Sequence, residues 1–466
     1  GDRQQYQFRQ MAARRAVAHI RRINSSASRV VARGVAGGAW SVGKAPLAVG
    51  PSPLPAALSA RVAAFTTTRP AAAATPQTKD DVGPLDELVR DFVAPADFYG
   101  QLMSRGVDFF TGVPDSLLKD FCAFVTDNAP RDRHVIAANE GSAVSLAAGY
   151  HMATGKVPLV YLQNSGLGNT VNPLLSLADS KVYSIPMLLL IGWRGEPGKK
   201  DEPQHRVQGQ LTPGMLASMG IQFEVLPDYS EGVAETLDAA LEHTRRRNAP
   251  FALLVKRQTF EAYKLVNKME NEYTLNREDA LRVALRELDD WDVVVGTTGF
   301  TSREVFELRE EWEQGHERDF LTVGSMGHAT AIAMGVALAK PSRQVFTFDG
   351  DGALIMHMGN MASVGLSGMK NYKHVVLNNG SHDSVGSQPT GALTMDIPMI
   401  AKGAGYQHTF VAATEEEIKE GIKALRAADG PALLELRVKP GARKDLGRPT
   451  TTTLENKLAF MEFLRN

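Results

Sequence analysis

The chain has 466 residues, of which 43% are hydrophobic, and its formal net charge is −1. This length is enough to bury the cores of two α/β domains. The balanced charge argues against a general nucleic-acid-binding protein. The single cysteine, Cys122, excludes an intrachain disulfide framework and a cysteine-based metal cluster. No stretch approaches eighteen consecutive apolar residues, so we expect no membrane partner.

The first 84 residues differ in composition from the rest of the chain. Between residues 1 and 79 the only acidic residue is Asp2, whereas arginine recurs throughout. A basic amphipathic helix is predicted from Met11 onward, and residues 45–77 have the composition of an unstructured linker. Such a leader is typical of an organellar transit peptide. We expect residues 1–84 to lie outside the fold and to direct the protein to the mitochondrial matrix. A basic tail without a targeting role, in a cytoplasmic protein, is the alternative.

Short apolar runs alternate with helix-period segments through the rest of the chain. In a first domain at 85–260, the predicted strands are 107–111, 134–138, 157–163, 185–191, 223–226 and 251–255. A polar linker at 261–276 leads to a second domain at 277–466, with predicted strands at 292–295, 320–323, 344–348, 374–377, 408–412 and 432–438. Such alternation is typical of parallel sheets that bind ligands at the carboxyl ends of their strands. The sequence predicts two tandem α/β domains, each a mostly parallel sheet with helices on both faces, and no central third domain.

The most informative motif joins Gly350-Asp351-Gly352 to Asn378-Asn379, and each half directly follows a predicted strand. Glycines let backbone N–H groups turn toward an anion at the start of a helix. One carboxylate and one amide oxygen suit Mg²⁺, whose octahedral shell is completed by water and by phosphate oxygens. The pattern resembles the diphosphate- and magnesium-binding motif of thiamine diphosphate enzymes. An Asp-Gly turn with an unrelated asparagine pair is the alternative.

Glu140 is the candidate catalytic group of the first domain. It directly follows the predicted strand 134–138 and opens a helix, where a carboxylate also stabilises the free N–H groups of the first turn. In a thiamine diphosphate enzyme the cofactor is the electron sink, and a carboxylate is needed against its pyrimidine nitrogen. Because the second domain carries the diphosphate motif, we interpret Glu140 as this carboxylate. A plain helix-capping role is the alternative.

Residues 90–466 resemble the phosphonopyruvate decarboxylase family of thiamine diphosphate-dependent decarboxylases. The segments that carry the resemblance are 111–116, 138–142, 164–169, 192–196, 350–379, 379–386 and 443–449. The resemblance implies a pyrimidine-binding (PYR) domain at 85–260 and a diphosphate-binding (PP) domain at 277–466. It also implies a carboxy-lyase that converts 3-phosphonopyruvate to 2-phosphonoacetaldehyde and CO₂ through the ylide of its cofactor, in phosphonate biosynthesis. The family pattern further implies a homo-oligomer, at least a dimer, with active sites between subunits.

The resemblance also assigns cofactor-binding roles. Mg²⁺ would be bound by the side chains of Asp351 and Asn379 and by the backbone carbonyl of Ser381. The Gly324 carbonyl would accept a hydrogen bond from the aminopyrimidine, and Met326, bulky and adaptable, would hold the cofactor in its bent shape. The remaining residues of the diphosphate site would be Gly350, Gly352 and Ala353.

The substrate site is less sharply defined by the sequence. A phosphonate dianion requires cationic donors, of which arginine is the one that binds bidentately. We predict that His382 returns the proton after CO₂ release. The alternative is that His382 only positions residues that contact the cofactor. The candidate substrate-binding residues are Asp115, Arg194, Arg443, Lys444 and Arg448. Asp115 is equally consistent with a helix cap, and each cation with solvated surface.

Three other functions remain open from the sequence. A sulfopyruvate decarboxylase would use the same cations, because a sulfonate is isosteric with a phosphonate. A carboligase would join the intermediate to a second aldehyde instead of protonating it. A catalytically silent regulatory subunit is disfavoured, because it has no physical need of Glu140, Asp351 and Asn379 together.

Overall fold

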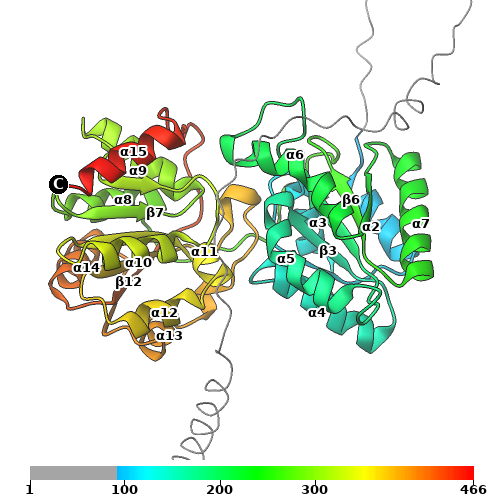
Figure 1. Ribbon diagram of the computed structural model, residues 1–466, viewed down its shortest axis with the longest axis horizontal. Coiled ribbons are helices and arrows are strands. Elements are labelled where there is room, and N and C mark those ends of the chain that lie inside the picture. Colours follow the sequence, from blue (N-terminus) through cyan, green and yellow to red (C-terminus); the bar gives the residue numbers. More distant parts are fainter. Residues whose placement is uncertain (1–91) are drawn as a thin grey trace, which may run out of the picture. The chain divides into compact units, whose positions relative to one another are not determined.

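The computed structural model describes residues 92–466, so the predictions for the leader at 1–84 lie outside the described part of the chain. Two six-stranded sheets, each parallel throughout, make up its architecture (Figure 1). The predicted fold class is therefore confirmed. Within residues 92–466 no helix combines the length and the apolar character needed to span a membrane.

The first sheet has the strand order β2-β1-β3-β4-β6-β5. Its strands are β1 (Phe110–Gly112), β2 (His134–Ile136), β3 (Leu159–Gln163), β4 (Leu188–Gly192), β5 (Gln222–Val225) and β6 (Phe251–Val255). The helices of this domain are α2 (Pro95–Ser104), α3 (Lys119–Asn128), α4 (Glu140–Thr154), α5 (Leu167–Pro173), α6 (Pro203–Ser218) and α7 (Ser230–Arg247). A 3₁₀ turn, η1 (Asn164–Gly166), precedes α5, and a π-helical turn, η2 (Leu174–Ala178), follows it.

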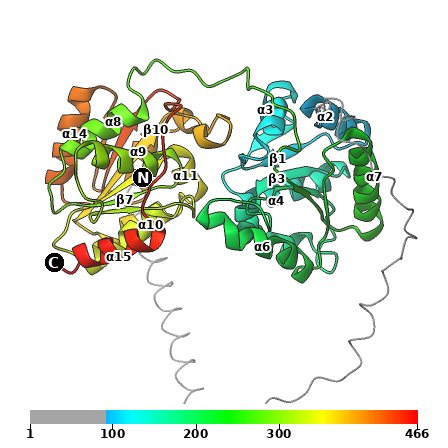
Figure 2. The same cartoon turned by 90° about the horizontal axis from the view of Figure 1, so that it is seen from above.

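The alternation of side chains along each strand produces two cores in this domain. On β4, Leu188 and Leu190 pack into a cluster with residues of α2, α3 and α7, whereas Leu189 and Ile191 pack against α4, α5 and α6. Both faces are therefore buried, which explains why the strands are continuous apolar runs. Figure 2 shows α2 and α3 on one side of the sheet and α6 on the other.

The second sheet has the order β11-β12-β10-β9-β7-β8. Its strands are β7 (Val293–Gly296), β8 (Asp319–Leu321), β9 (Val345–Gly350), β10 (Tyr372–Asn378), β11 (His408–Ala412) and β12 (Ala432–Arg437). The helices are α8 (Arg277–Arg286), α9 (Phe300–Glu311), α10 (Ala329–Ala339), α11 (Asp351–Met356), α12 (Asn360–Ser367), α13 (Ile397–Gly403), α14 (Glu415–Ala427) and α15 (Thr453–Phe463). Two 3₁₀ turns, η3 (Asp383–Val385) and η4 (Ala392–Thr394), follow β10.

Two cores also flank the second sheet. Val375 and Leu377 pack with α8, α9 and α14, and Val376 packs with α10, α12 and α13. Figure 2 shows α8 and α14 on one side of this sheet and α10 and α15 on the other. Strands β9 and β10 are paired in register, with Gly350 opposite Leu377. The residues that follow these two strands therefore emerge side by side at the carboxyl edge of the sheet.

The strand predictions agree with the structure throughout the described residues. Each of the twelve predicted segments overlaps one observed strand, because an apolar run buried on both faces is a strong signal. Residues 174–178, which lie between the predicted strands 157–163 and 185–191, form the π-helical turn η2. Strand β6 ends at Val255 and α8 starts at Arg277, with no named helix or strand between them. The domain boundaries at 260 and 277 stay predictions.

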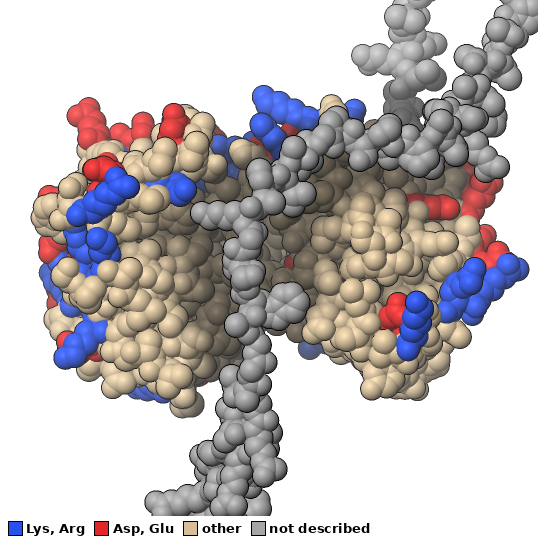
Figure 3. All heavy atoms as spheres, in the orientation of Figure 1, with Lys and Arg blue, Asp and Glu red and all other residues tan. Residues whose placement is uncertain are grey.

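Charged side chains on the face shown in Figure 3 occur in small groups in which basic and acidic residues are mixed. This arrangement agrees with the balanced composition of the chain. That face therefore offers no extended field of one sign to attract a polyanion.

Candidate active site

The GDG turn begins at the last residue of β9 and continues into the short helix α11. Asp351 is 4% exposed, and its Oδ2 accepts hydrogen bonds from the Gly380 N–H at 3.0 Å and the Thr390 hydroxyl at 2.6 Å. Burial raises the pKa of Asp351 to about 6, although the hydrogen bonds from Thr390, Gly352 and Gly380 oppose that rise. The loop after β10 is thus attached directly to the predicted metal carboxylate.

Asn379 follows β10 in that loop and is 3% exposed. Its Nδ2 donates to Asp383 Oδ2 at 2.7 Å, and its Oδ1 accepts from the Ser381 N–H at 2.9 Å. Ser381 is also buried, and its backbone forms an isolated bridge with Pro389. The structure therefore brings all three predicted magnesium ligands into the two adjoining loops that follow β9 and β10.

These residues fit a divalent cation by their chemistry and by their charge. A carboxylate, an amide oxygen and a backbone carbonyl are the hard oxygen donors that Mg²⁺ prefers. Asp351, Asp383 and Glu304 are buried carboxylates, and the Asp383 charge acts on Asp351. Among the described residues the ion pairs of this cluster involve one guanidinium, that of Arg277. Asp351 has no ion-pair partner among the described residues, so a divalent cation would supply the positive charge that this buried carboxylate requires.

No group of three or more histidine, cysteine or acidic side chains that could hold a metal ion occurs within residues 92–466. Structural metal sites built entirely from such side chains have closed shells. A site with one carboxylate and one amide instead leaves coordination positions for phosphate oxygens and water. The geometry is therefore consistent with a cation that binds together with a diphosphate.

The turn between β8 and α10 carries the other predicted cofactor contacts. Ser325 has φ of 54° and Gly327 has φ of 82°, so two left-handed residues flank the half-buried Met326. A serine in this region is uncommon and is strained relative to glycine. Strain of this kind is frequent at ligand sites, and here it fixes the backbone on both sides of Met326 and directly after Gly324.

Glu140 is the first residue of α4 and is 5% exposed. The helix cap is Asn139, whose side chain accepts a hydrogen bond from the Ser142 N–H at 2.9 Å. Asn139 therefore performs the capping role that was the alternative interpretation of Glu140. Glu140 Oε2 accepts a hydrogen bond from Asn169 Nδ2 at 2.7 Å. A Cβ atom on Gly166 would lie only 2.2 Å from Glu140 Oε1. Backbone and side chains of 166–169 therefore set the position of a buried carboxylate.

His382 lies against the GDG turn. A Cβ atom on Gly352 would be 2.7 Å from Cε1 and 2.8 Å from Nδ1 of His382, so only glycine leaves space for the ring. Burial lowers the pKa of His382 to about 4, and the nearby Asp383 carboxylate opposes this shift. The ring is consequently neutral near pH 7. The ring lies beside Gly352 of the predicted diphosphate site, and the role of His382 in proton return stays a prediction.

The predicted substrate cations are mostly paired with carboxylates. Arg194 is bidentate to Asp201, at 2.9 and 2.5 Å, and also donates to Ser116 at 2.8 Å. Burial raises the pKa of Asp201, but the Arg194 hydrogen bond outweighs it, and the pKa lies well below its ordinary value. Arg448 pairs with Glu202 at 2.5 Å.

The other predicted substrate residues lie in equally different settings. Arg443 pairs with Glu278 and with Glu307. Lys444 is exposed and has no ion pair among the described residues. Asp115 is fully buried and accepts from Leu117 and Leu118 N–H groups and from Gln163, as a cap does. Its pKa is raised by burial, against the Gln163 hydrogen bond.

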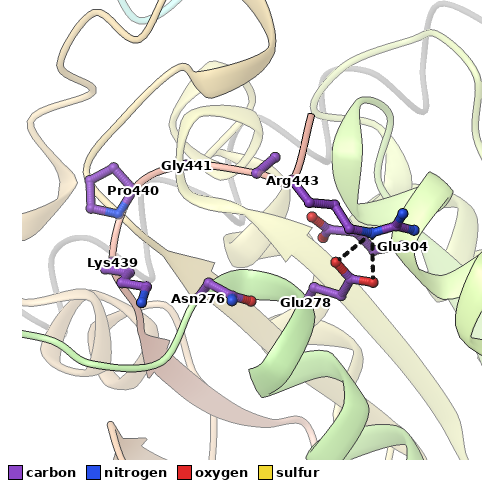
Figure 4. A pocket seen from close by; sticks show the side chains of 8 residues that line it. Asn276, Glu278, Glu304, Lys439, Pro440, Gly441 and Arg443 are labelled. Atoms are coloured by element: carbon purple, nitrogen blue, oxygen red, sulfur yellow. Dashed lines mark hydrogen bonds and ion pairs between the residues drawn. The ribbon is translucent and has the colours of Figure 1, made fainter. Parts of the chain in front are cut away.

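The C-terminal tail borders a pocket of about 300 Å³ in the second domain (Figure 4). Figure 4 shows Arg443 and Glu278 facing each other across hydrogen bonds at its edge. The residues that line it are Asn276, Glu278, Glu304, Lys439, Pro440, Gly441, Ala442 and Arg443. Arg443, a predicted substrate-binding residue, holds the tail against α8 and α9 through its ion pairs with Glu278 and Glu307.

Several contacts of the candidate site residues were not predicted from the sequence. Asn169 and Gly166 lie in a segment used to establish the resemblance, but their contact with Glu140 depends on how α4 and α5 pack. Thr390 lies in an irregular loop, and nothing in its sequence context signals a bond to Asp351. The sequence does indicate one further contact: Asp383 is an acidic residue four positions after Asn379, which is close enough for a hydrogen bond between their side chains.

Comparison with known proteins agrees with this geometry. The model of the N-terminal TPP binding domain of thiamine pyrophosphate enzymes matches residues 96–215, and that of the C-terminal TPP binding domain matches residues 298–436. Thiamine pyrophosphate is thiamine diphosphate under its other name. The fold and the site together define a thiamine pyrophosphate enzyme.

The chain belongs to the phosphonopyruvate decarboxylase family. It is 32% identical to phosphonopyruvate decarboxylase of Streptomyces viridochromogenes over 387 residues, which cover 80% of this chain and 95% of that protein. Its identity to phosphonopyruvate decarboxylase of Streptomyces hygroscopicus is 33%, with coverage of 80% and 94%. It is also similar to sulfopyruvate decarboxylase of Methanosarcina acetivorans, at 27% identity with coverage of 73% and 90%.

Proposed function

We propose that the enzyme catalyses the non-oxidative decarboxylation of 3-phosphonopyruvate to 2-phosphonoacetaldehyde and CO₂, a step in phosphonate biosynthesis. The observation that carries this proposal is a sequence identity of 32–33% over almost the full length of two phosphonopyruvate decarboxylases. The buried Glu140 and the joined loops of Asp351 and Asn379 support it independently.

The cofactor, when bound, supplies the sink for the electron pair released as the bond between the keto carbon and the carboxylate breaks. In the proposal, Glu140 would hold the proton that it shares with the pyrimidine nitrogen. Asn169 holds one oxygen of that carboxylate, at Oε2, which leaves Oε1 for the ligand. Because Glu140 is 5% exposed, water competes little for this proton.

The metal in the proposal is Mg²⁺, held by Asp351, Asn379 and the Ser381 carbonyl and completed by diphosphate oxygens. Cation binding would keep Asp351 ionised, because an adjacent positive charge lowers the pKa of a carboxyl group. The Gly324 carbonyl and Met326 would contact the pyrimidine side. His382, packed on Gly352, would return the proton after CO₂ release, with support of the diphosphate side as the alternative.

The phosphonate remains to be assigned a cation. Lys444 is the one predicted candidate without an ion pair among the described residues, which makes its charge available to a dianion. Arg194 keeps two guanidinium nitrogens on Asp201 and one on Ser116, so it acts on the site mainly by fixing the loop after β4.

The assembly in the proposal is a homo-oligomer, at least a dimer, with active sites between subunits.

Residues 1–84 are proposed to be a leader that directs the protein to the mitochondrial matrix, on the strength of their arginine-rich, acid-poor composition. Expression with the leader fused to a fluorescent protein tests its role. Mitochondrial fluorescence that is lost when the arginines are replaced supports the proposal, and diffuse fluorescence from the intact leader contradicts it.

A second candidate substrate is sulfopyruvate, favoured by the similarity to the sulfopyruvate decarboxylase of Methanosarcina acetivorans. A carboligase is the third candidate. Incubation of the enzyme with phosphonopyruvate or with sulfopyruvate, in the presence of thiamine diphosphate and Mg²⁺, separates them when CO₂ is measured and the phosphonopyruvate products are followed by ³¹P NMR. One new phosphonate signal with one equivalent of CO₂ supports the proposal. An adduct larger than the aldehyde identifies a carboligase, and absence of CO₂ contradicts decarboxylation of this substrate.

A further inference from the structure

Asp383 accepts three hydrogen bonds on a single carboxylate oxygen. Its Oδ2 receives the Asn379 side-chain N–H at 2.7 Å, the Gly441 backbone N–H at 2.9 Å and the Arg277 guanidinium at 3.1 Å. The donors come from the loop after β10, the C-terminal tail and the start of α8. Asp383 therefore joins three segments that are far apart in the sequence, and one of these segments contains Asn379, a proposed metal ligand.

The contact with Asn379 fixes which end of its amide faces the metal. An amide presents an acceptor at one end and two donors at the other, and only the oxygen can bind Mg²⁺. Because Asp383 is an acceptor, it holds the nitrogen of Asn379, and the oxygen lies on the opposite side. The Ser381 N–H, at 2.9 Å from Oδ1, reinforces the same orientation.

Arg277 and the tail in turn fix Asp383. Arg277 is 6% exposed. Its guanidinium is bidentate to Glu304, at 2.8 Å for both bonds, and its third nitrogen, Nη1, donates to Asp383. The tail is held by Lys439 N–H to the Leu275 carbonyl at 2.8 Å. Figure 4 shows the tail passing over Asn276, Glu278 and Glu304 on its way to Arg443.

We propose that Asp383, held by Arg277 and by Gly441, is the positioning residue that orients the Asn379 amide oxygen toward the metal. Groups that lie behind the ligands of a metal commonly set its affinity, and their loss typically costs about 10–100-fold in binding. This inference rests on the proposed magnesium site and adds to it a residue that does not touch the metal. It also gives the tail a function, because Gly441 is bonded to the same oxygen.

The test is the affinity of the protein for Mn²⁺ in the presence of saturating thiamine diphosphate, with free Mn²⁺ followed by EPR. Mn²⁺ reports on an oxygen-ligand site without a need for turnover. Asp383→Ala removes the acceptor, and we expect the Kd for Mn²⁺ to rise by about 10–100-fold. Asp383→Asn keeps an oxygen that can accept the same three hydrogen bonds, and we expect its Kd to stay within about threefold of wild type.

Asp319→Ala is the matched control. Asp319 is fully buried in the same domain and is bidentate to Arg309, at 2.9 and 3.0 Å. It starts β8, at the amino end of the sheet, away from the metal loops. We expect this variant to melt at a lower temperature than wild type and to bind Mn²⁺ with unchanged affinity.

The inference is overturned if Asp383→Ala binds Mn²⁺ as wild type does, or if Asp383→Asn is as weak as Asp383→Ala. It is also overturned if Asp319→Ala weakens Mn²⁺ binding equally, because general destabilisation would then account for the effect. Wild-type protein that binds no Mn²⁺ with thiamine diphosphate would remove the metal site itself and the inference with it.

Discussion

The contact between Gly166 and Glu140 leads to a prediction whose size follows from the structure. A methyl group at position 166 would lie 2.2 Å from Oε1, 2.4 Å from Cδ and 2.6 Å from Cγ of Glu140, whereas ordinary contact begins at 3.4 Å. Gly166→Ala must therefore displace the carboxylate by about 1 Å, and a displacement of this size at a catalytic group costs about 10²-fold in rate. Overpacking of this kind costs a further 1–3 kcal/mol or so of stability, which leaves the fold intact.

The assay is steady-state CO₂ release by Gly166→Ala, with folding checked by circular dichroism and thermal melting. We expect kcat to fall by about 10²-fold while the circular dichroism spectrum is unchanged. Gly149→Ala is the matched control: it makes the same substitution on α4, the helix that carries Glu140, and its Cβ meets nothing within 4 Å. We expect wild-type kcat from this control.

A folded Gly166→Ala enzyme with wild-type kcat would refute the reasoning. It would mean either that Glu140 moves without consequence or that its position is not set by Gly166. Equal losses in Gly166→Ala and Gly149→Ala would refute it as well, because the effect would then not depend on the contact with Glu140.

Three other predictions follow from the site and the fold. Glu140→Ala lowers kcat by about 10²–10⁴-fold with the fold retained, because proton transfer to the cofactor loses its partner; near wild-type turnover would remove Glu140 from the mechanism. Asp351→Ala abolishes Mg²⁺-dependent binding of thiamine diphosphate, as measured by titration of intrinsic fluorescence, and an unchanged affinity would be incompatible with the metal assignment. His134 bonds to Tyr161 at 2.8 Å, and burial lowers its pKa to about 4. The unfolded state therefore takes up the proton first as the pH falls below about 6.5, so His134 destabilises the native protein between about pH 6.5 and pH 4. His134→Gln should remove this loss. The difference in unfolding free energy between variant and wild type should therefore shift by about 2 kcal/mol in favour of the variant when the pH is lowered from 8 to 5. Parallel curves of stability against pH would contradict the assignment.

Much of the fold was predictable because the central strands of both sheets are buried on both faces. Runs such as Leu188–Gly192 and Phe251–Val255 are apolar at every or nearly every position, and that signal does not depend on tertiary detail. The proximity of two predicted magnesium ligands was predictable for a related reason. Asp351 and Asn379 each follow a strand, and the carboxyl ends of parallel strands meet at one edge of the sheet.

The contacts between side chains were not predictable, because they depend on how distant segments pack. Arg443 is held by Glu278, 165 positions away in the chain, so its availability to a substrate was invisible in the sequence. The same is true of Asp383, whose partners Arg277 and Gly441 lie 106 residues before it and 58 residues after it in the sequence. A charge that looks free in a sequence is often already paired in the fold.

The central claim is that this chain decarboxylates phosphonopyruvate by means of Glu140 and the Asp351–Asn379 metal site. The most direct measurement is kcat/KM for CO₂ release from phosphonopyruvate, sulfopyruvate and pyruvate in parallel, with thiamine diphosphate and Mg²⁺ present. We predict a value for phosphonopyruvate at least about tenfold above the other two, a difference of about 1.4 kcal/mol in transition-state stabilisation. Preference for sulfopyruvate would contradict the proposed substrate while leaving the mechanism in place, and no turnover of any of the three would contradict the claim as a whole.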